Sequence, residues 1–309
     1  MFINSIYSDI VKCSKTLGCI TLINESLKKH TSFKIGGPAD IFIYINNLES
    51  AKILINLINK KNLPFFILGN GTNLLVSDEG YRGIILSFAK CEKFLNLENE
   101  NIISCSSGIP LAWVCVFALK NNLSGLEFAW GIPGSCGGAV FMNAGAYGHD
   151  ISDVILCCTH IDNDGNERTL SKKELDFSYR KSFYSNKSFA ITSLKFKLKR
   201  DDPELMRQRM YENILKRKSK QPLEYPNAGS IFKRPKGHFA GALVESCGLK
   251  GASFGGAAVS EKHSGFIINK GGAKAQDAIN LIKYIKEKVY SKFGVNLECE
   301  IKTLGNIEV

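Results

Sequence analysis

The stretch GIPGSCGGAVFMNAGAYG, residues 131–148, holds more glycine and alanine than an ordinary turn requires. Glycine lets another molecule approach the main chain closely because it carries no side chain. Trp130, Phe141 and Tyr147 stand in or beside the same stretch, and aromatic rings pack well against a flat ligand. The composition therefore predicts a loop that binds a ligand along its backbone.

A second, shorter glycine loop, GNGTNLL at 69–75, follows the strand-like run 63–68. A dinucleotide fingerprint would need a third glycine where Leu74 stands and a helix after it, whereas the following VSDEGYRG predicts a turn and a strand. Consecutive amides in such a loop can still form an anion-binding nest, and an ordinary turn is the competing interpretation. Together the two loops suit a long ligand with a diphosphate in its middle and a flat ring at its end.

Hydrophobic periodicity around the loops predicts both strands and helices. We expect strands at 41–45, 63–68, 194–199 and 295–305, and helices at 48–62, 110–122, 239–248 and 275–293. The run 153–170 predicts a hairpin that turns at Asp164-Gly165. Asp202 as a cap and Pro203 as the first helical residue predict a further helix, and we place the main domain boundary there.

Composition limits the classes of protein. The chain of 309 residues, 44% hydrophobic and 22% charged, is typical of a globular protein with two or three domains. No apolar run reaches the roughly 20 residues of a membrane span, and the first residues do not resemble a secretory signal. The ten cysteines lack the paired spacing of metal or redox motifs, so we expect reduced core residues, no metal site and a cytoplasmic location.

The net charge of +11 has two interpretations. One is a nucleic-acid-binding protein. The other is a protein that attracts small anionic ligands, which the even spread of lysines along the chain favours. We therefore expect no nucleic-acid partner.

Six motifs in order resemble the UDP-N-acetylenolpyruvoylglucosamine reductases, over nearly the whole chain from about His30. They are HTSFKIGGPAD (30–40), LGNGTNLLVSD (68–78), GIPGSCGGAVFMNAGAYG (131–148), FSYRKSFY (177–184), NAGSIFKRP (227–235) and LECEIKTLG (297–305). The resemblance implies an α+β fold with a two-lobed FAD-binding domain of the PCMH/vanillyl-alcohol-oxidase type and a C-terminal α+β substrate-binding domain. The implied bounds are an N-terminal extension at 1–29, a flavin domain at 30–200 with lobes at about 30–88 and 89–200, and a substrate domain at 201–309.

The resemblance also implies a reaction. NADPH reduces a noncovalently bound FAD, and the reduced flavin converts the enolpyruvyl ether of a UDP-sugar to UDP-N-acetylmuramate during peptidoglycan synthesis. Ser230 corresponds to the proton donor, Arg180 to the arginine that stabilises the substrate carboxylate, and Glu300 to the third catalytic residue. From the sequence alone, Ser230 has neither the elbow nor the adjacent base of a nucleophile, Arg180 reads as a surface arginine, and Glu300 reads as an exposed strand residue.

The remaining expected site residues come from the two loops and from the substrate half of the resemblance. The cofactor candidates are Gly69, Asn70, Gly71, Thr72, Asn73, Gly131, Ile132, Pro133, Gly134, Ser135, Gly137, Gly138, Asn143, Gly145, Ala146 and Tyr147. The substrate candidates are Tyr179, Lys220, Asn227, Lys233 and Arg234, because anionic oxygens need such donors. For the basic run at 216–220, a solvated surface is the competing interpretation.

Only Lys199 to Asp202 separate the last expected flavin-domain strand from the next helix, so the chain resembles the short-loop branch of the family. We expect a monomer or a weak oligomer. The alternative function is that of another FAD-dependent oxidoreductase of the same flavin-domain superfamily. The NAGS and LECE motifs favour the reductase because they belong to its substrate half.

Overall fold

The structure is a computed structural model that describes residues 5–308. The chain divides into two compact units, each made of several stretches. The first holds the chain up to Ile23, Ile41–Asn70 and Gly83–Lys216, and the second holds Asn24–Asp40, Gly71–Arg82 and the chain from Arg217 onward. Each unit is described by itself below.

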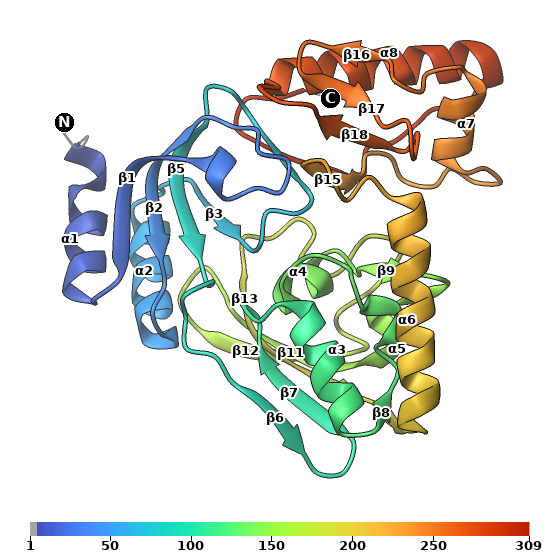
Figure 1. Cartoon of the computed structure of the whole chain (residues 1–309). Helices are drawn as coiled ribbons and strands as arrows, with labels where there is room; N and C mark the ends of the chain where they lie inside the picture. Colours follow the sequence, from blue (N-terminus) through green and yellow to red (C-terminus); the bar gives the residue numbers. More distant parts are fainter. Residues whose placement is uncertain (1–4, 309) are drawn as a thin grey trace. The chain divides into compact units, whose positions relative to one another are not determined.

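A four-stranded sheet lies near the amino terminus (Figure 1). Its strands, in spatial order, are β1 (Ile20–Ser26), β2 (Pro38–Tyr44), β5 (Tyr81–Ser87) and β3 (Phe65–Leu68). β3 and β5 run parallel, and α2 (Leu48–Lys60) forms between β2 and β3. The predicted strand, helix and strand at 41–68 are therefore confirmed.

The amino-terminal residues that the sequence left without a role belong to the same layer. α1 (Ser8–Thr16) packs beside α2, and its Ile10 and Val11 are buried in the core with Leu54 and Ile58. β1 occupies the edge of the sheet. Helix α1 is amphipathic, so its apolar side is stabilised by burial against α2 and the sheet.

A five-stranded sheet forms the other half of the first unit. Its order is β12 (Glu167–Ser171), β11 (Ile155–Ile161), β13 (Ala190–Lys197), β7 (Ile102–Ser106) and β6 (Leu95–Glu98), with antiparallel neighbours throughout. The predicted hairpin, β11 to β12, is confirmed. The sheet packs with α3 (Leu111–Lys120), α4 (Cys136–Phe141) and α5 (Ile151–Val154), and the short strands here are β8 (Leu123–Ser124), β9 (Gly145–Ala146), β10 (His149–Asp150) and β14 (Lys199–Arg200).

The link from β13 to the next helix is short. β14 pairs with β8, and α6 (Pro203–Lys220) begins at once, at the residue that the sequence predicted. The Asp202 carboxylate accepts a hydrogen bond from the Glu204 amide at 2.7 Å, which confirms Asp202 as the cap. The division between the two units falls inside the last turn of this helix.

The second unit has a four-stranded antiparallel sheet in the order β15 (Asn227–Ser230), β18 (Phe266–Asn269), β17 (Ala257–Val259) and β16 (Ser253–Phe254). It packs with α7 (Ala240–Ser246) and α8 (Ala275–Phe293), and both helix predictions are confirmed. β4 (Leu74–Val76) and β19 (Lys302–Leu304) pair in parallel.

The predicted strand at 295–305 is wrong except for β19. Leu297 and Ile301 are buried in the core of the second unit, so the apolar pattern that suggested a ladder instead reflects side chains that pack against α8 and its neighbours. Before β19, this segment also forms an isolated antiparallel bridge between Cys299 and Phe232. Periodicity identified the buried residues correctly and their hydrogen bonding incorrectly.

Candidate active site

The structure brings the two predicted glycine loops into contact inside the first unit. β3 ends immediately before Gly69, and Ser135 caps α4, its hydroxyl accepting from the Gly138 amide at 3.2 Å. A Cβ on Gly69 would lie 2.8 Å from Ser135 Oγ, so only glycine fits there without a shift of the serine. The ends of a strand and a helix, far apart in sequence, therefore form one surface.

The second glycine stretch is not one continuous loop, as the sequence suggested, because Cys136–Phe141 forms α4. The amides of Cys136 and Gly137 donate to Ile109 O and Ser107 O, each at 2.9 Å. A Cβ on Gly137 would lie 2.9 Å from Ser107 Cβ, so glycine permits this close approach. The helix start is thereby fixed against the segment that follows β7.

The residues present fit a bound pyrophosphate. Within residues 5–308, the amides of Gly69, Asn70 and Gly134 donate no hydrogen bond to the protein. Unpaired backbone donors beside glycines are the group that phosphate oxygens need. The same surface could therefore hold the diphosphate of a nucleotide cofactor.

Cys136 lies in this region but is not placed for covalent attachment. Its side chain is fully buried, and interaction with the Cys105 thiol together with burial raises its pKa well above the ordinary thiol value. A protonated, buried thiol is a poor nucleophile. The geometry therefore agrees with a dissociable flavin.

Gly71 and the residues after it are held by the second unit's own HTS segment. Gly71 has φ +60°, and a Cβ there would lie 2.1 Å from His30 O. The Ser32 amide donates to Gly71 O at 3.1 Å, and Ser32 Oγ donates to Asn227 O at 2.7 Å. The sequence analysis quoted this segment as a motif but gave its residues no function, and the structure shows that they support both Gly71 and the strand that leads to Ser230.

Arg180 is held by the end of the second glycine stretch. Its guanidinium donates to Asn143 O at 3.4 Å and to Gly145 O at 3.1 Å, and lies 3.3 Å from Asp150 Oδ1. The side chain is only 16% exposed, and the Tyr179 ring lies 4.9 Å from its guanidinium carbon. Arg180 is therefore not the surface arginine that its local sequence suggests.

Asn143 supports this arrangement from a buried position. Its side-chain amide donates to Ser178 O at 3.1 Å, and its Oδ1 accepts from the Ser152 amide at 2.9 Å. Its φ of +41° is uncommon for a residue other than glycine. These bonds connect the glycine stretch to the turn that carries Arg180.

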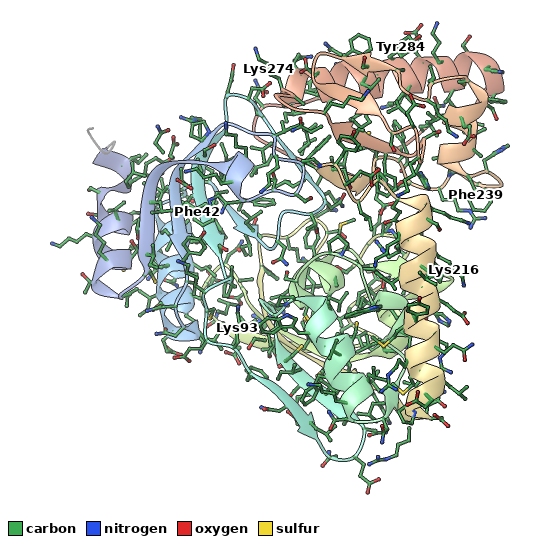
Figure 2. The ribbon with its side chains drawn as sticks, in the orientation of Figure 1. Phe42, Lys93, Lys216, Phe239, Lys274 and Tyr284 are labelled. Atoms are coloured by element: carbon green, nitrogen blue, oxygen red, sulfur yellow. The ribbon has the colours of Figure 1, made fainter. Side chains whose placement is uncertain are left out.

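Tyr147 connects the same stretch to α6. Its hydroxyl donates to Asn213 O at 2.9 Å, and Lys216 Nζ lies 5.9 Å from the ring centroid. Lys216 lies in the second half of α6 (Figure 2). The structure thus gives the hydroxyl of a predicted cofactor residue a partner on α6.

The segments that carry Ser230 and Glu300 are hydrogen-bonded to each other in the second unit. The Glu300 amide donates to the carbonyl of Ile231, the residue after Ser230, at 2.8 Å. The Ser230 hydroxyl donates to Phe232 O at 3.1 Å, and the Glu300 carbonyl accepts from Asn73 Nδ2 at 3.2 Å. Both side chains are half-buried, and Glu300 lies before β19 rather than within a strand.

The predicted substrate contacts are less uniform. The side-chain amide of Asn227 donates to Pro222 O and Tyr225 O, and its Oδ1 accepts from the Gly229 amide. Asn227 therefore stabilises the turn before Ser230. Lys233 pairs with Glu298 at 2.8 Å. The other three candidates are Tyr179, which is 46% exposed, Lys220, which is exposed near the end of α6, and Arg234, whose guanidinium lies 4.0 Å from the Phe239 ring.

The described part of the chain contains no cluster of metal ligands, no disulfide and no helix able to span a membrane. No group of three or more histidine, cysteine or acidic side chains is arranged to hold a metal ion. All ten cysteines are free. No helix there is both long enough and apolar enough to cross a membrane.

Comparison with known proteins gives two family matches. An FAD binding domain model matches residues 39–171, and the model of the UDP-N-acetylenolpyruvoylglucosamine reductase C-terminal domain matches residues 221–304. The chain is 51% identical over 284 residues to the UDP-N-acetylenolpyruvoylglucosamine reductase of Clostridium botulinum, which covers 92% of each chain. It is 47% identical to the reductase of Caldanaerobacter subterraneus over 92% of this chain and 93% of that one.

A solved structure also resembles the chain. The crystal structure of the UDP-N-acetylenolpyruvylglucosamine reductase from Thermus caldophilus superposes with a TM-score of 0.78 at 31% identity. The match covers 93% of this chain and 99% of that chain.

Proposed function

Because this chain belongs to the UDP-N-acetylenolpyruvoylglucosamine reductase family, we propose that Arg180, Ser230 and Glu300 are the catalytic residues of its reaction. The reaction is the NADPH-dependent reduction of UDP-N-acetylglucosamine enolpyruvate to UDP-N-acetylmuramate, in peptidoglycan precursor synthesis. The enzyme is a flavoprotein, and family membership decides against the alternative of another flavin oxidoreductase. When bound, FAD would be the carrier that takes a hydride from NADPH and passes it to the substrate.

The two glycine loops bind the cofactor. The amides of Gly69, Asn70 and Gly134, which have no protein acceptor, would donate to the diphosphate oxygens, and Thr72, Asn73 and the 143–147 segment would contact other parts of the cofactor. Binding of this kind is noncovalent. We assign the flavin domain to 30–200 and the substrate domain to 201–309, with 1–29 preceding them. By residue contacts alone, 30–40 and 71–82 group with the second unit instead.

The reduction adds a hydride to the terminal methylene carbon of the enolpyruvyl group and a proton to the neighbouring carbon. Arg180 carries a fixed positive charge that stabilises negative charge developing on the substrate carboxylate. The Ser230 hydroxyl gives its proton to the carbon, in place of its present bond to Phe232 O. Glu300 polarises the carboxylate or returns a proton to the serine.

The observation that carries this proposal is the bond from the Glu300 amide to Ile231 O, next to Ser230. It supports a paired role because it joins the main-chain segments that carry the two half-buried side chains. Tyr179, Lys220, Asn227, Lys233 and Arg234 contact or orient the UDP-sugar. The enzyme is cytoplasmic, a location that its free cysteines suit, and is a monomer or a weak oligomer.

An anaerobic half-reaction tests the function. The FAD-loaded protein is reduced with one equivalent of NADPH, and UDP-N-acetylglucosamine enolpyruvate is then added. We expect flavin absorbance to return and UDP-N-acetylmuramate to form. UDP-N-acetylglucosamine, which lacks the enolpyruvyl group, is the control and should leave the flavin reduced. A flavin that stays reduced with both sugars would overturn the proposal.

A further inference from the structure

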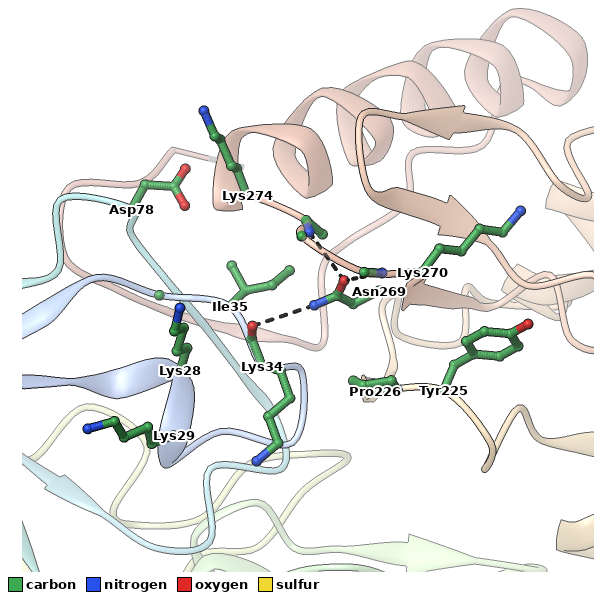
Figure 3. Close-up of a pocket in the computed structure, with 14 residues that line it drawn as sticks. Lys28, Lys29, Lys34, Ile35, Asp78, Tyr225, Pro226, Asn269, Lys270 and Lys274 are labelled. Atoms are coloured by element: carbon green, nitrogen blue, oxygen red, sulfur yellow. Dashed lines mark hydrogen bonds between the residues drawn. The ribbon is translucent and has the colours of Figure 1, made fainter.

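A pocket in the second unit takes no part in the function described so far. Its cavity volume is about 860 Å³, and its walls come from the 28–36 segment, Asp78, the 225–226 pair and the 269–274 loop. Figure 3 shows these residues around the start of α8. A volume of this size is within the range of sites that hold small molecules, about 300–1,000 Å³.

Asn269 fixes the walls of the pocket. Its side chain is 6% exposed, and its Nδ2 donates to Phe33 O at 3.1 Å. Its Oδ1 accepts from the amides of Gly271 at 2.9 Å and Ala273 at 3.2 Å, as drawn in Figure 3. One buried amide thus ties the glycine loop to the 33–34 segment, so the pocket is built in advance of any ligand.

The charge of the lining is strongly positive. Five lysines and one acid line the pocket, and the acid, Asp78, accepts from the amides of Ala275 at 2.8 Å and Gln276 at 3.2 Å. Its negative charge therefore stabilises the start of α8. Lys29 pairs with Glu25 at 3.3 Å.

The other four lysines have no acidic partner. Within residues 5–308, Lys28, Lys34, Lys270 and Lys274 form no salt bridge. All four are exposed, and each ammonium group stands on a flexible four-carbon stem that can turn toward a ligand. Four like charges around one cavity attract an anion with several charges.

The pocket also offers apolar surface. Tyr225, which is 43% exposed, stands with Pro226 at one side, and Ile35 contributes to the wall. An exposed aromatic ring beside a proline suits a flat heterocycle. A ligand whose phosphates contact the lysines and whose flat base packs against Tyr225 would be a nucleotide.

The pocket is separate from the candidate catalytic pair in the same unit. Pro226 precedes β15 and Ser230 ends it, and a β-bulge with Gly229 at φ +78° lies between them. The bond from Ser32 Oγ to Asn227 O lies in that interval. None of the three proposed catalytic residues is among the residues that line the pocket.

We propose that this pocket is a second, non-catalytic binding site for a nucleoside polyphosphate. The proposal goes beyond the reductase function and does not depend on it. Lys28, Lys34, Lys270 and Lys274 bind the phosphates, and Tyr225 packs against the base.

Titration calorimetry with ATP tests the proposal on the FAD-loaded protein. The pocket variant is Lys34→Gln with Lys274→Gln, and the matched control is Lys172→Gln with Lys173→Gln, an exposed pair in the first unit that changes the net charge equally. We expect ATP to bind the wild type and the control with the same affinity. It should bind the pocket variant about tenfold more weakly, which is the loss expected for two solvent-exposed charged contacts. Tripolyphosphate should bind more weakly than ATP to the wild type, because it lacks the base.

Three results would overturn the proposal. The first is the absence of ATP binding to wild type. The second is an equal loss in both variants, since the effect would then be one of net charge alone. The third is displacement of ATP by saturating NADP⁺ or UDP-N-acetylglucosamine, which would place the nucleotide at the catalytic site. Flavin content and turnover of the pocket variant should match wild type in every case, so the test is independent of the reductase assay.

Discussion

Replacement of Gly71 by alanine should weaken both the fold and the retention of FAD. Gly71 has φ +60°, and a Cβ at this position would lie 2.1 Å from His30 O and 3.0 Å from Thr31 Cα. Both contacts are with backbone, so no side-chain rotation can relieve them. The loop that carries Thr72 and Asn73 must move instead.

The size of the effect follows from two separable costs. An L-residue other than glycine in the left-handed region costs about 1–2 kcal/mol. Overpacking against a rigid neighbour adds a further 1–3 kcal/mol, roughly. Gly294 provides the matched control, because it has φ +68° after α8 and a Cβ there would meet nothing within 4 Å. Gly294→Ala should therefore show the first cost alone.

Urea unfolding of each purified variant measures the free energy of unfolding, and absorbance after gel filtration gives bound flavin per chain. We expect Gly294→Ala to keep its FAD and to lose about 1–2 kcal/mol. Gly71→Ala should lose about 2–5 kcal/mol and a large part of its flavin. Equal losses of stability in the two variants would refute the argument from the His30 contact, and full flavin content in Gly71→Ala would refute the loop as a cofactor site.

Three further predictions concern the catalytic serine, the cofactor and the link to α6. Ser230→Ala should be reduced by NADPH at the wild-type rate, whereas stopped-flow reoxidation by the enolpyruvyl substrate should slow about 10²–10⁴-fold; unchanged reoxidation would exclude Ser230 as proton donor. Acid precipitation should leave yellow flavin in the supernatant, and a yellow pellet would contradict noncovalent binding. Burial opposes ionisation of Glu127, but hydrogen bonds from Arg209 and backbone amides lower its pKa below the usual value. This depressed pKa stabilises the fold above the unfolded-state pKa of the carboxyl, and the contribution is lost as pH falls through the folded-state pKa. Arg209→Ala should cost about 1–3 kcal/mol at pH 7, discounted because Arg209 is 42% exposed, and should lose less stability than wild type on acidification to pH 3; a parallel decline of the two proteins would contradict the pair.

Local patterns predicted the elements whose side chains follow one regular period. The apolar stripe at 275–293 gave α8 with its observed bounds, and Asp202-Pro203 marked the start of α6. The strands β6 and β7 escaped prediction because they are short, and half of β6 faces solvent. The strand prediction at 295–301 was wrong because side chains buried in the second unit's core produce the same alternation of apolar and polar residues as a strand.

Some features of the candidate site could be predicted from the sequence, and others could not. Glycine content indicated both loops, because the close approach of the Ser135 and Ser107 side chains favours glycine at Gly69 and Gly137. The short helix α4 was missed, since glycine lowers helix propensity and the Ser135 cap outweighs it here. The support that Asn143 gives Arg180, and that Ser32 gives the strand before Ser230, depends on chain segments that meet only in the folded protein. No local pattern could reveal them.

The parallel pair of β4 and β19 has a consequence for biosynthesis. Leu74–Val76 leaves the ribosome long before its partner Lys302–Leu304. Phe33 and Leu75 are buried with Ile282 and Ile301, so these early apolar side chains remain exposed until the residues around Ile282 and Ile301 have been made. The first unit has all of its chain once Lys216 has emerged, whereas the second does not. A premature stop before Lys302 should therefore leave β4 without its partner strand, and the second unit should complete its core later than the first.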